Sequence, residues 1–475
     1  MQNPWLASML LAVAVAAAPL PVIAQPTTLQ ASDAPAAIDS LRQEIQALRA
    51  LHEAQLRALE QRLLAAEARL AAPPPAVAVA ATGLSAPPPA PAISLATTAP
   101  AASANAFNPA VSLILSGGYS RRTGVSAGTP AASGVWLPAD AERAPRGFSL
   151  AETELVFAAS VDPWWHGTVN LALHPDNVAS VEEAFVQTTA LGQGLSLKAG
   201  RFFSGVGYLN AQHAHTWDFV DNPLAYQVFL GTQLGDDGLQ LRWLAPTEQF
   251  IELGLELGRG RGFPGGDNPR NGAGLVALTA HAGGDLGESQ SWRAGLSALH
   301  AQAEGQALSG LAADGSTASA SFGGSSRVWL ADAVWKWAPN GNATRTSLKL
   351  QGEWLINQRR GSLEASGASP ADYRSTQSGG YLQAVYQFMP GWRVAARGEW
   401  LNPGLAGPGG DIGLNAGTDG PYRPRKQSLM LDFNASEFSR VRLQIDNDRA
   451  VQGRSDHPIS LQYQMSLGAH GAHSF

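Results

Sequence analysis

Residues 459–475 are ISLQYQMSLGAHGAHSF, a stretch in which hydrophobic and polar residues alternate up to the carboxyl terminus. Ile459 and Leu461 fall on one face of an extended chain, whereas Ser460 falls on the other. In a bilayer every backbone N–H and C=O group must be paired, so only helices and closed barrels can span it. Barrel strands alternate between a lipid face and a wet lumen. The stretch therefore predicts the closing strand of a transmembrane antiparallel β-barrel that ends on the aromatic residue Phe475.

The composition supports this fold class and excludes others. The chain has no cysteine, so neither disulfides nor thiolate metal sites are available. Its net charge of −6 argues against nucleic acid as a partner. After the first segment, no apolar run reaches the roughly 18 residues of a membrane helix. A soluble β-sandwich is the alternative, and the regular hairpins and the placement of the aromatic residues disfavour it.

The first part of the chain resembles a secretory signal. Residues 9–18 are apolar, and Val22, Ile23 and Ala24 offer small side chains for cleavage. We therefore expect a signal peptide over residues 1–24 and a disordered segment over 25–38. Because no Lys or Arg precedes the apolar run, a retained helical anchor is the alternative.

Residues 39–70 are expected to form a coiled-coil helix. Leu41, Ile45 and Leu48 have the three-four spacing of a coiled coil, and Arg and Glu residues lie between them. A lone amphipathic helix has nothing to pack against, so we expect it to self-associate. A single helix on the periplasmic end of the barrel is the alternative. Residues 71–107 are rich in Ala and Pro and predict a semi-extended linker.

Residues 108–475 are expected to form the barrel, with about 16 strands of roughly ten residues each. The strands are expected to begin near Val111, Phe148, Trp164, Ser180, Leu195, Gly238, Phe250, Gly274, Ser291, Ser326, Thr346, Gly380, Trp392, Gln427, Phe438 and Pro458. Short connections alternate with mostly long ones, which is the asymmetry between periplasmic turns and external loops. Aromatic residues such as Trp164, Trp243 and Phe438 sit beside the short turns, where an interfacial girdle is expected.

Alternation also predicts which charged residues line the lumen, because a charge on the lipid face costs a few kcal/mol. The wall residues expected to contact solute are Lys198, Arg242, Glu252, Glu256, Arg393, Arg397, Glu399, Arg442 and Asp446. The same reasoning places further charges inside: Glu152, Glu154, Glu183, Asp332, Lys336, Lys349, Glu353, Lys426 and Asp432. Rings of charged side chains set ion selectivity. Alternatively, these groups only keep the pore wet and pair with one another.

The third external connection, residues 205–234, is long and unusually aromatic. Such a loop needs burial, so we expect it to fold into the lumen as a constriction. Its candidate solute-binding residues are Tyr208, His213, His215, Trp217, Asp218, Asp221 and Tyr226. Packing against the wall for stability alone is the alternative. His213 and His215, with Asp218 and Asp221, also form a candidate zinc site, since imidazole and carboxylate suit that metal.

The whole arrangement resembles the trimeric outer-membrane porins, specifically the phosphate-selective-porin-like superfamily. Some members, of the dicarboxylate-porin type, have an N-terminal coiled coil before the barrel. VEEAFV at 181–186, followed by LKAGRF at 197–202, is similar to the strand pair that precedes the third loop in that group. The resemblance implies a homotrimer in lipid and lipopolysaccharide that gives passive diffusion of small polar or charged solutes, with no cofactor.

Three other functions remain as alternatives. An enzyme is not expected, because no Ser, His and Asp set lies at barrel-rim spacing. A receptor or transporter for a metal ion or chelate, of the TonB-dependent kind, needs about twenty-two strands. A structural tether would use the barrel only as an anchor.

Overall fold

A computed structural model describes residues 109–468, except 125–128, 140–145, 151–152, 175–177, 267–270, 313–314, 366–368, 405–413 and 415–421. The expected signal peptide, disordered segment, coiled coil and linker lie outside the described residues, as do Glu152 and Phe475. Among the described residues, no helix is long and apolar enough to cross a membrane.

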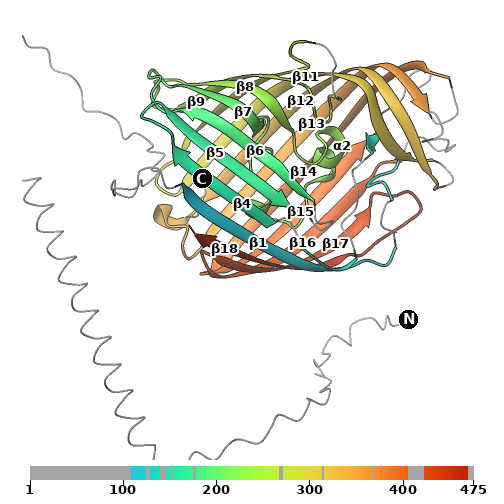
Figure 1. Ribbon diagram of the computed structural model, residues 1–475. Coiled ribbons are helices and arrows are strands. Elements are labelled where there is room, and N and C mark those ends of the chain that lie inside the picture. The colour runs from blue at the N-terminus through green and yellow to red at the C-terminus, as the bar shows by residue number, and fades with distance from the viewer. Residues whose placement is uncertain are drawn as a thin grey trace, which may run out of the picture. The chain divides into compact units, whose positions relative to one another are not determined.

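The described part is a single antiparallel sheet with a few short helical turns (Figure 1). Its strands are β1 (Ala110–Arg121), β2 (Leu137–Pro138), β3 (Gly147–Leu150), β4 (Thr153–Ser160), β5 (Trp165–Leu173), β6 (Ala179–Thr188), β7 (Leu195–Phe203), β8 (Gly235–Leu244), β9 (Phe250–Gly258), β10 (Leu275–Asp285), β11 (Gln290–Leu311), β12 (Thr317–Trp337), β13 (Ser347–Ala365), β14 (Ala371–Met389), β15 (Trp392–Asn402), β16 (Arg425–Ser436), β17 (Ser439–Arg449) and β18 (Ile459–Gly468). The helical turns are η1 (Ala214–Thr216), α2 (Leu224–Phe229) and η2 (Pro339–Gly341).

The sheet closes on itself through β1. Leu113 lies opposite Leu467 of β18 on one side and opposite Leu155 of β4 on the other. Since β3 and β4 both pair with β1, they are two parts of one strand, and β2 is a short addition to β11. Within the described residues the barrel thus has 16 strands, as the sequence predicts.

The outer face of the barrel is apolar. Leu253, Leu255 and Leu257 are exposed on β9, and Leu461 and Tyr463 are exposed on β18. Residues that alternate with them, such as Glu256 and Gln464, are buried. Alternation is therefore confirmed over these strands, and an exposed apolar surface of this extent is suited to lipid.

Seven connections of two to nine residues gather at one end of the barrel, here called the short-turn end. The connections between the strands are 161–164, 189–194, 245–249, 286–289, 338–346, 390–391 and 437–438. Trp164, Phe388 and Phe438 are exposed beside these turns, as an interfacial girdle requires. Trp337 also lies beside one of these turns, and both Trp337 and Phe438 line the interior cavity.

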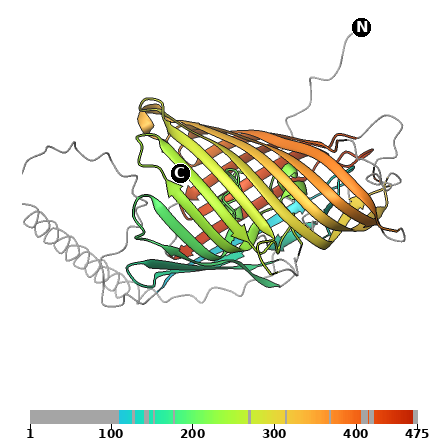
Figure 2. The ribbon, with the colours of Figure 1, turned by 90° about the horizontal axis from the view of Figure 1, so that it is seen from above.

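Four strands are about twice as long as the sequence suggests. β11, β12, β13 and β14 have 22, 21, 19 and 19 residues, so segments expected to be external loops continue the ladder (Figure 2). These segments are rich in Gly, Ala and Ser, which indicates loops by composition. Their inward side chains nevertheless pack: Leu308 and Phe322 are buried with Trp136 in one apolar cluster. Packing against neighbours outweighs weak strand propensity here.

The lumen contains an apolar core of its own. The third loop packs α2 against the inner face of the barrel, where Phe229 and Tyr226 meet Leu355 and Tyr381. A segment of the first external connection, residues 129–139, enters the same core through Val135. Its β2 pairs with β11. Entry of the third loop was expected from the sequence, whereas entry of the first was not.

Candidate functional site in the barrel lumen

One residue joins the two ends of the third loop, which follows β7 and precedes β8. The side-chain amide of Asn210 donates to the carbonyl oxygens of Ser204 and Leu234, at 2.8 and 2.9 Å. Its oxygen accepts from the backbone N–H of Leu234 at 2.8 Å. One buried asparagine thus joins the two ends of the loop, and the 30-residue excursion is held closed at its base.

Glu353 of β13 holds the loop against the far wall. Its carboxylate accepts from the backbone N–H groups of Tyr208 and Leu209, at 3.2 and 3.0 Å. It also accepts from the hydroxyls of Tyr226 and Tyr381, both at 2.7 Å. Three of the four donors belong to the third loop. A single buried carboxylate on the wall therefore carries much of the polar anchoring of the loop.

The two loop aspartates are paired with cations of the wall. Asp218 lies 2.5 Å from Lys349 and 3.4 Å from Arg393. Asp221 lies 2.8 Å from Arg397 and also contacts Lys426. Burial alone would raise the pKa of each carboxyl, but the charges of these bases outweigh it and lower the pKa below its usual value. Both aspartates are therefore ionised near neutral pH and neutralised locally.

A cavity of about 1360 Å³ lies between the third loop and the short-turn end. The carboxylates of Glu154 from β4 and Glu183 from β6 form its acidic wall. Its basic wall is formed by Lys336, Lys349, Arg393 and Arg440, from β12, β13, β15 and β17. Charged groups of both signs thus line this cavity. Lysine, arginine and glutamate at such positions agree with the alternation expected from the sequence.

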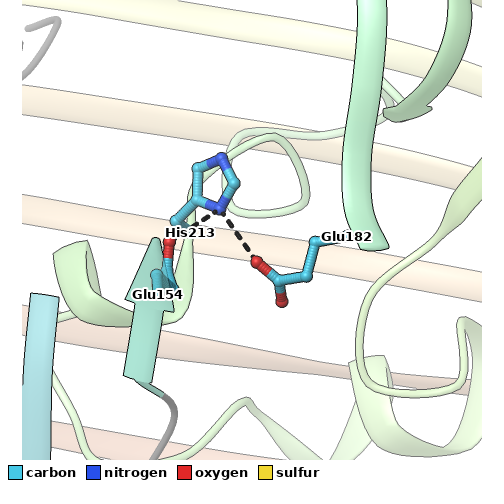
Figure 3. A group of neighbouring side chains, drawn as sticks. All are labelled: Glu154, Glu182 and His213. Carbon is cyan, nitrogen blue, oxygen red and sulfur yellow. Dashed lines mark ion pairs between the residues drawn. The ribbon is translucent and has the colours of Figure 1, made fainter. Parts of the chain in front are cut away.

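The two loop histidines face the acidic wall, and Figure 3 shows His213 beside Glu154 and Glu182. His215 Nδ1 lies 2.7 Å from Glu154 Oε1. His213 Nδ1 lies 3.5 Å from Glu154 and 3.4 Å from Glu182, while its Nε2 lies 2.9 Å from Glu183. Burial would lower the pKa of His213, but these carboxylates reverse the effect and raise it well above the usual value.

The remaining expected residues also lie inside, although not all of them reach the cavity. Tyr208 lines the cavity, with the Arg293 guanidinium 5.5 Å from the centre of its ring. Trp217 and Tyr226 are buried in the apolar core instead. Of the other wall residues, Lys198 lies over the Phe185 ring, 4.2 Å from its centre. The rest contact polar partners: Arg242 with Glu252, Glu256 with Ser204, Glu399 with Arg397, Arg442 with Asp432, and Asp446 with Gln444.

Sequence reasoning missed two polar residues of this site. Glu182 is not among the residues expected in the lumen, yet its carboxylate lies 3.4 Å from His213 Nδ1. Asn170 of β5 donates to Glu154 and Glu182 at 2.9 and 3.1 Å. Adjacent glutamates in a strand are the one signal of an irregularity there.

Comparisons with known proteins give distant likenesses. No protein-family model matches the chain. A protein of Aquifex aeolicus (strain VF5), described as uncharacterized, is 29% identical over 351 residues, which is 70% of each chain.

Among solved structures, the chain is similar to the outer membrane channel DcaP of Acinetobacter baumannii, with 11% identity and a TM-score of 0.43 over 76% of this chain and 97% of that one. It is also similar to an anion-selective porin from Comamonas acidovorans, with 10% identity and a TM-score of 0.45 over 76% of this chain and 99% of that one. Likeness at this level supports no statement about a solute.

Proposed function

We propose that the protein is an outer-membrane porin that allows passive diffusion of small polar or charged solutes. The observation that carries the proposal is the combination of an apolar outer face with a charged, hollow interior. A barrel that served only as an anchor has no need of a cavity of about 1360 Å³ lined by both signs of charge. The short-turn end is assigned to the periplasm, as in other bacterial barrels.

The third loop is proposed as the constriction of this channel. It carries Asp218 and His213 to the inner boundary of the cavity, between the acidic and the basic walls. A solute that passes these walls meets fixed charges in a confined space of low dielectric, where each charge acts more strongly than on a surface. The proposed solute contacts are the loop and wall residues named above.

Two parts of the proposal concern assembly and the alternatives. We infer a homotrimer, in which the helix expected over residues 39–70 reinforces contacts between barrels. A receptor of the TonB-dependent kind is less consistent with 16 strands than with about twenty-two. We propose no enzymatic activity.

Liposome swelling tests the function. Proteoliposomes with the full chain are expected to swell in small sugars, amino acids and dicarboxylates at rates that fall with solute size. The control is the same protein heat-denatured before reconstitution. Swelling no faster than in this control, for every solute, would eliminate the channel and leave the tether. Submicromolar binding of a metal chelate without swelling would favour the receptor.

A further inference from the structure

A β-bulge places two consecutive glutamates of β6 inside the lumen. Asn170 lies opposite Glu183 and Leu171 lies opposite Val181, so Glu182 has no counterpart on β5. In a regular strand, neighbours point to opposite faces, and one of the two carboxylates would face lipid. Bulges redirect side chains and are frequent next to functional sites. Here the bulge brings both carboxylates to His213.

The carboxylates around His213 exceed the positive charge of its ring. Glu154, Glu182 and Glu183 all have an oxygen within 3.5 Å of one of its two nitrogens. Even a protonated imidazole carries a single charge, and Glu154 and Glu182 approach the same nitrogen, Nδ1. A divalent cation at this point would bring two positive charges to these carboxylates, where a proton on the ring brings one.

Ligand atoms of Glu154, Glu182 and His213 converge there within 4.8 Å of one another (Figure 3), and the side-chain amide of Asn170 adds a fourth group. His213 Nδ1 lies 3.5 Å from Glu154 Oε2 and 3.4 Å from Glu182 Oε2. The terminal amide atom of Asn170 lies 2.9, 3.1 and 3.1 Å from these three atoms. Zinc bonds to N and O ligands of about 2.0–2.2 Å give tetrahedral edges of about 3.3–3.6 Å. Shifts of a few tenths of an ångström would complete the coordination.

Asn170 provides an independent indication of a ligand. Its side chain is 1% exposed, and its Oδ1 is buried without a hydrogen-bond partner. Its amide nitrogen donates to Glu154 and Glu182, and it also lies 3.1 Å from His213 Nδ1. Half a turn of the carboxamide exchanges oxygen and nitrogen, and presents Oδ1 to the same point. With a cation bound there, the orphaned oxygen gains its partner.

The surrounding contacts are those that hold metal ligands in place. A metal-ligating histidine usually donates its other N–H to a carboxylate. Glu183 Oε2 lies 2.9 Å from His213 Nε2, and its Oε1 accepts from the backbone N–H of Phe203 at 3.0 Å. The second oxygen of Glu154 is held by His215 at 2.7 Å. His213 and Glu154 are therefore each held in orientation by a second hydrogen-bonding partner.

We propose that Glu154, Glu182, His213 and Asn170 bind a divalent transition-metal ion of the Zn²⁺ class, and that this ion fixes the third loop to β4, β5 and β6. One imidazole nitrogen with carboxylate and amide oxygens at tetrahedral spacing suits Zn²⁺. Ca²⁺ instead takes six to eight oxygens at longer distances. The site goes beyond the proposed channel and does not depend on it.

Metal titration of the folded full chain in detergent tests the proposal, with Zn²⁺ competing against a chelating dye. One Zn²⁺ per chain is expected, bound more tightly than Ca²⁺. His213→Ala is expected to weaken Zn²⁺ binding by about a hundredfold, and Glu182→Gln and Glu183→Gln by about tenfold each. X-ray absorption should show one imidazole, with N and O ligands at about 2.0 Å.

His281→Ala is the matched control, since His281 also lies in the wall, 3.4 Å from the single carboxylate of Glu252. It should leave Zn²⁺ affinity unchanged. Heat-dependent gel mobility verifies that each variant is folded. Zn²⁺ binding no tighter than millimolar in the folded wild type would overturn the proposal. So would affinity that falls equally in the His281 and His213 variants, or that survives in folded His213→Ala.

Discussion

Replacing Glu353 by Ala should release the third loop from the wall. The loop donates three hydrogen bonds to this carboxylate, from the N–H groups of Tyr208 and Leu209 and from the hydroxyl of Tyr226. At the lower end of about 1.5 kcal/mol for a bond to a charged acceptor, three bonds amount to roughly 4.5 kcal/mol. Since about 1.4 kcal/mol is a factor of ten, the displaced loop should become about a thousandfold more populated relative to the seated loop.

Single-channel recording in a planar bilayer measures this change directly. Wild type should give a steady conductance, and Glu353→Ala should give frequent transitions to a higher level. Glu353→Gln, which keeps the shape and one acceptor oxygen, should lie between them. Glu252→Gln is the control, because Glu252 contacts Arg242 and His281 of the wall. If folded Glu353→Ala has the same conductance and noise as wild type, the assigned anchoring is wrong.

Three further predictions concern charge, acid and assembly. Asp218→Asn with Asp221→Asn should leave Lys349, Arg393, Arg397 and Lys426 without these carboxylates. The reversal potential in a KCl gradient should then move toward anion selectivity. An unchanged reversal potential would mean that the two aspartates do not line the conducting path. Because the folded-state pKa of both aspartates is lowered, their stabilisation of the loop is fully present above the unfolded value of about 3.9 and is lost as pH falls below it. Channel noise should therefore rise between about pH 4 and pH 2, and a flat profile would count against the ion pairs. Deleting residues 25–106 should lower the temperature at which the native trimer dissociates, measured by native mass spectrometry; an equally stable trimer would dismiss the expected coiled coil.

The strand order and the facing of the wall could be predicted from the sequence because a membrane barrel enforces strict alternation. Leu253 and Leu255 must contact lipid while Glu256 must not, so the polarity of each side chain determines whether it faces lipid or the lumen. The short turns followed from the same constraint, since they separate alternating segments of similar length. Burial of the third loop followed from its aromatic residues, which water does not favour.

Other features could not be predicted from the sequence because they depend on contacts between segments that are far apart along the chain. The extension of β11 and β12 rests on packing of Leu308 and Phe322 against Trp136, which arrives from the first external connection. The apolar residues of that connection, around Val135, were a signal of the same kind as those of the third loop. The bulge at Glu182 has no local signature beyond two adjacent glutamates, so its inward direction appears only with the register of β5 and β6.

The central claim is that the lumen conducts and that the third loop narrows it. Single-channel conductance of the full chain and of a variant lacking residues 212–226, recorded in the same salt, tests both parts together. We predict discrete ion conductance for the full chain and a larger conductance for the deletion, with both proteins folded by heat-dependent gel mobility. Equal conductance in the two proteins, or none in either, would contradict the claim.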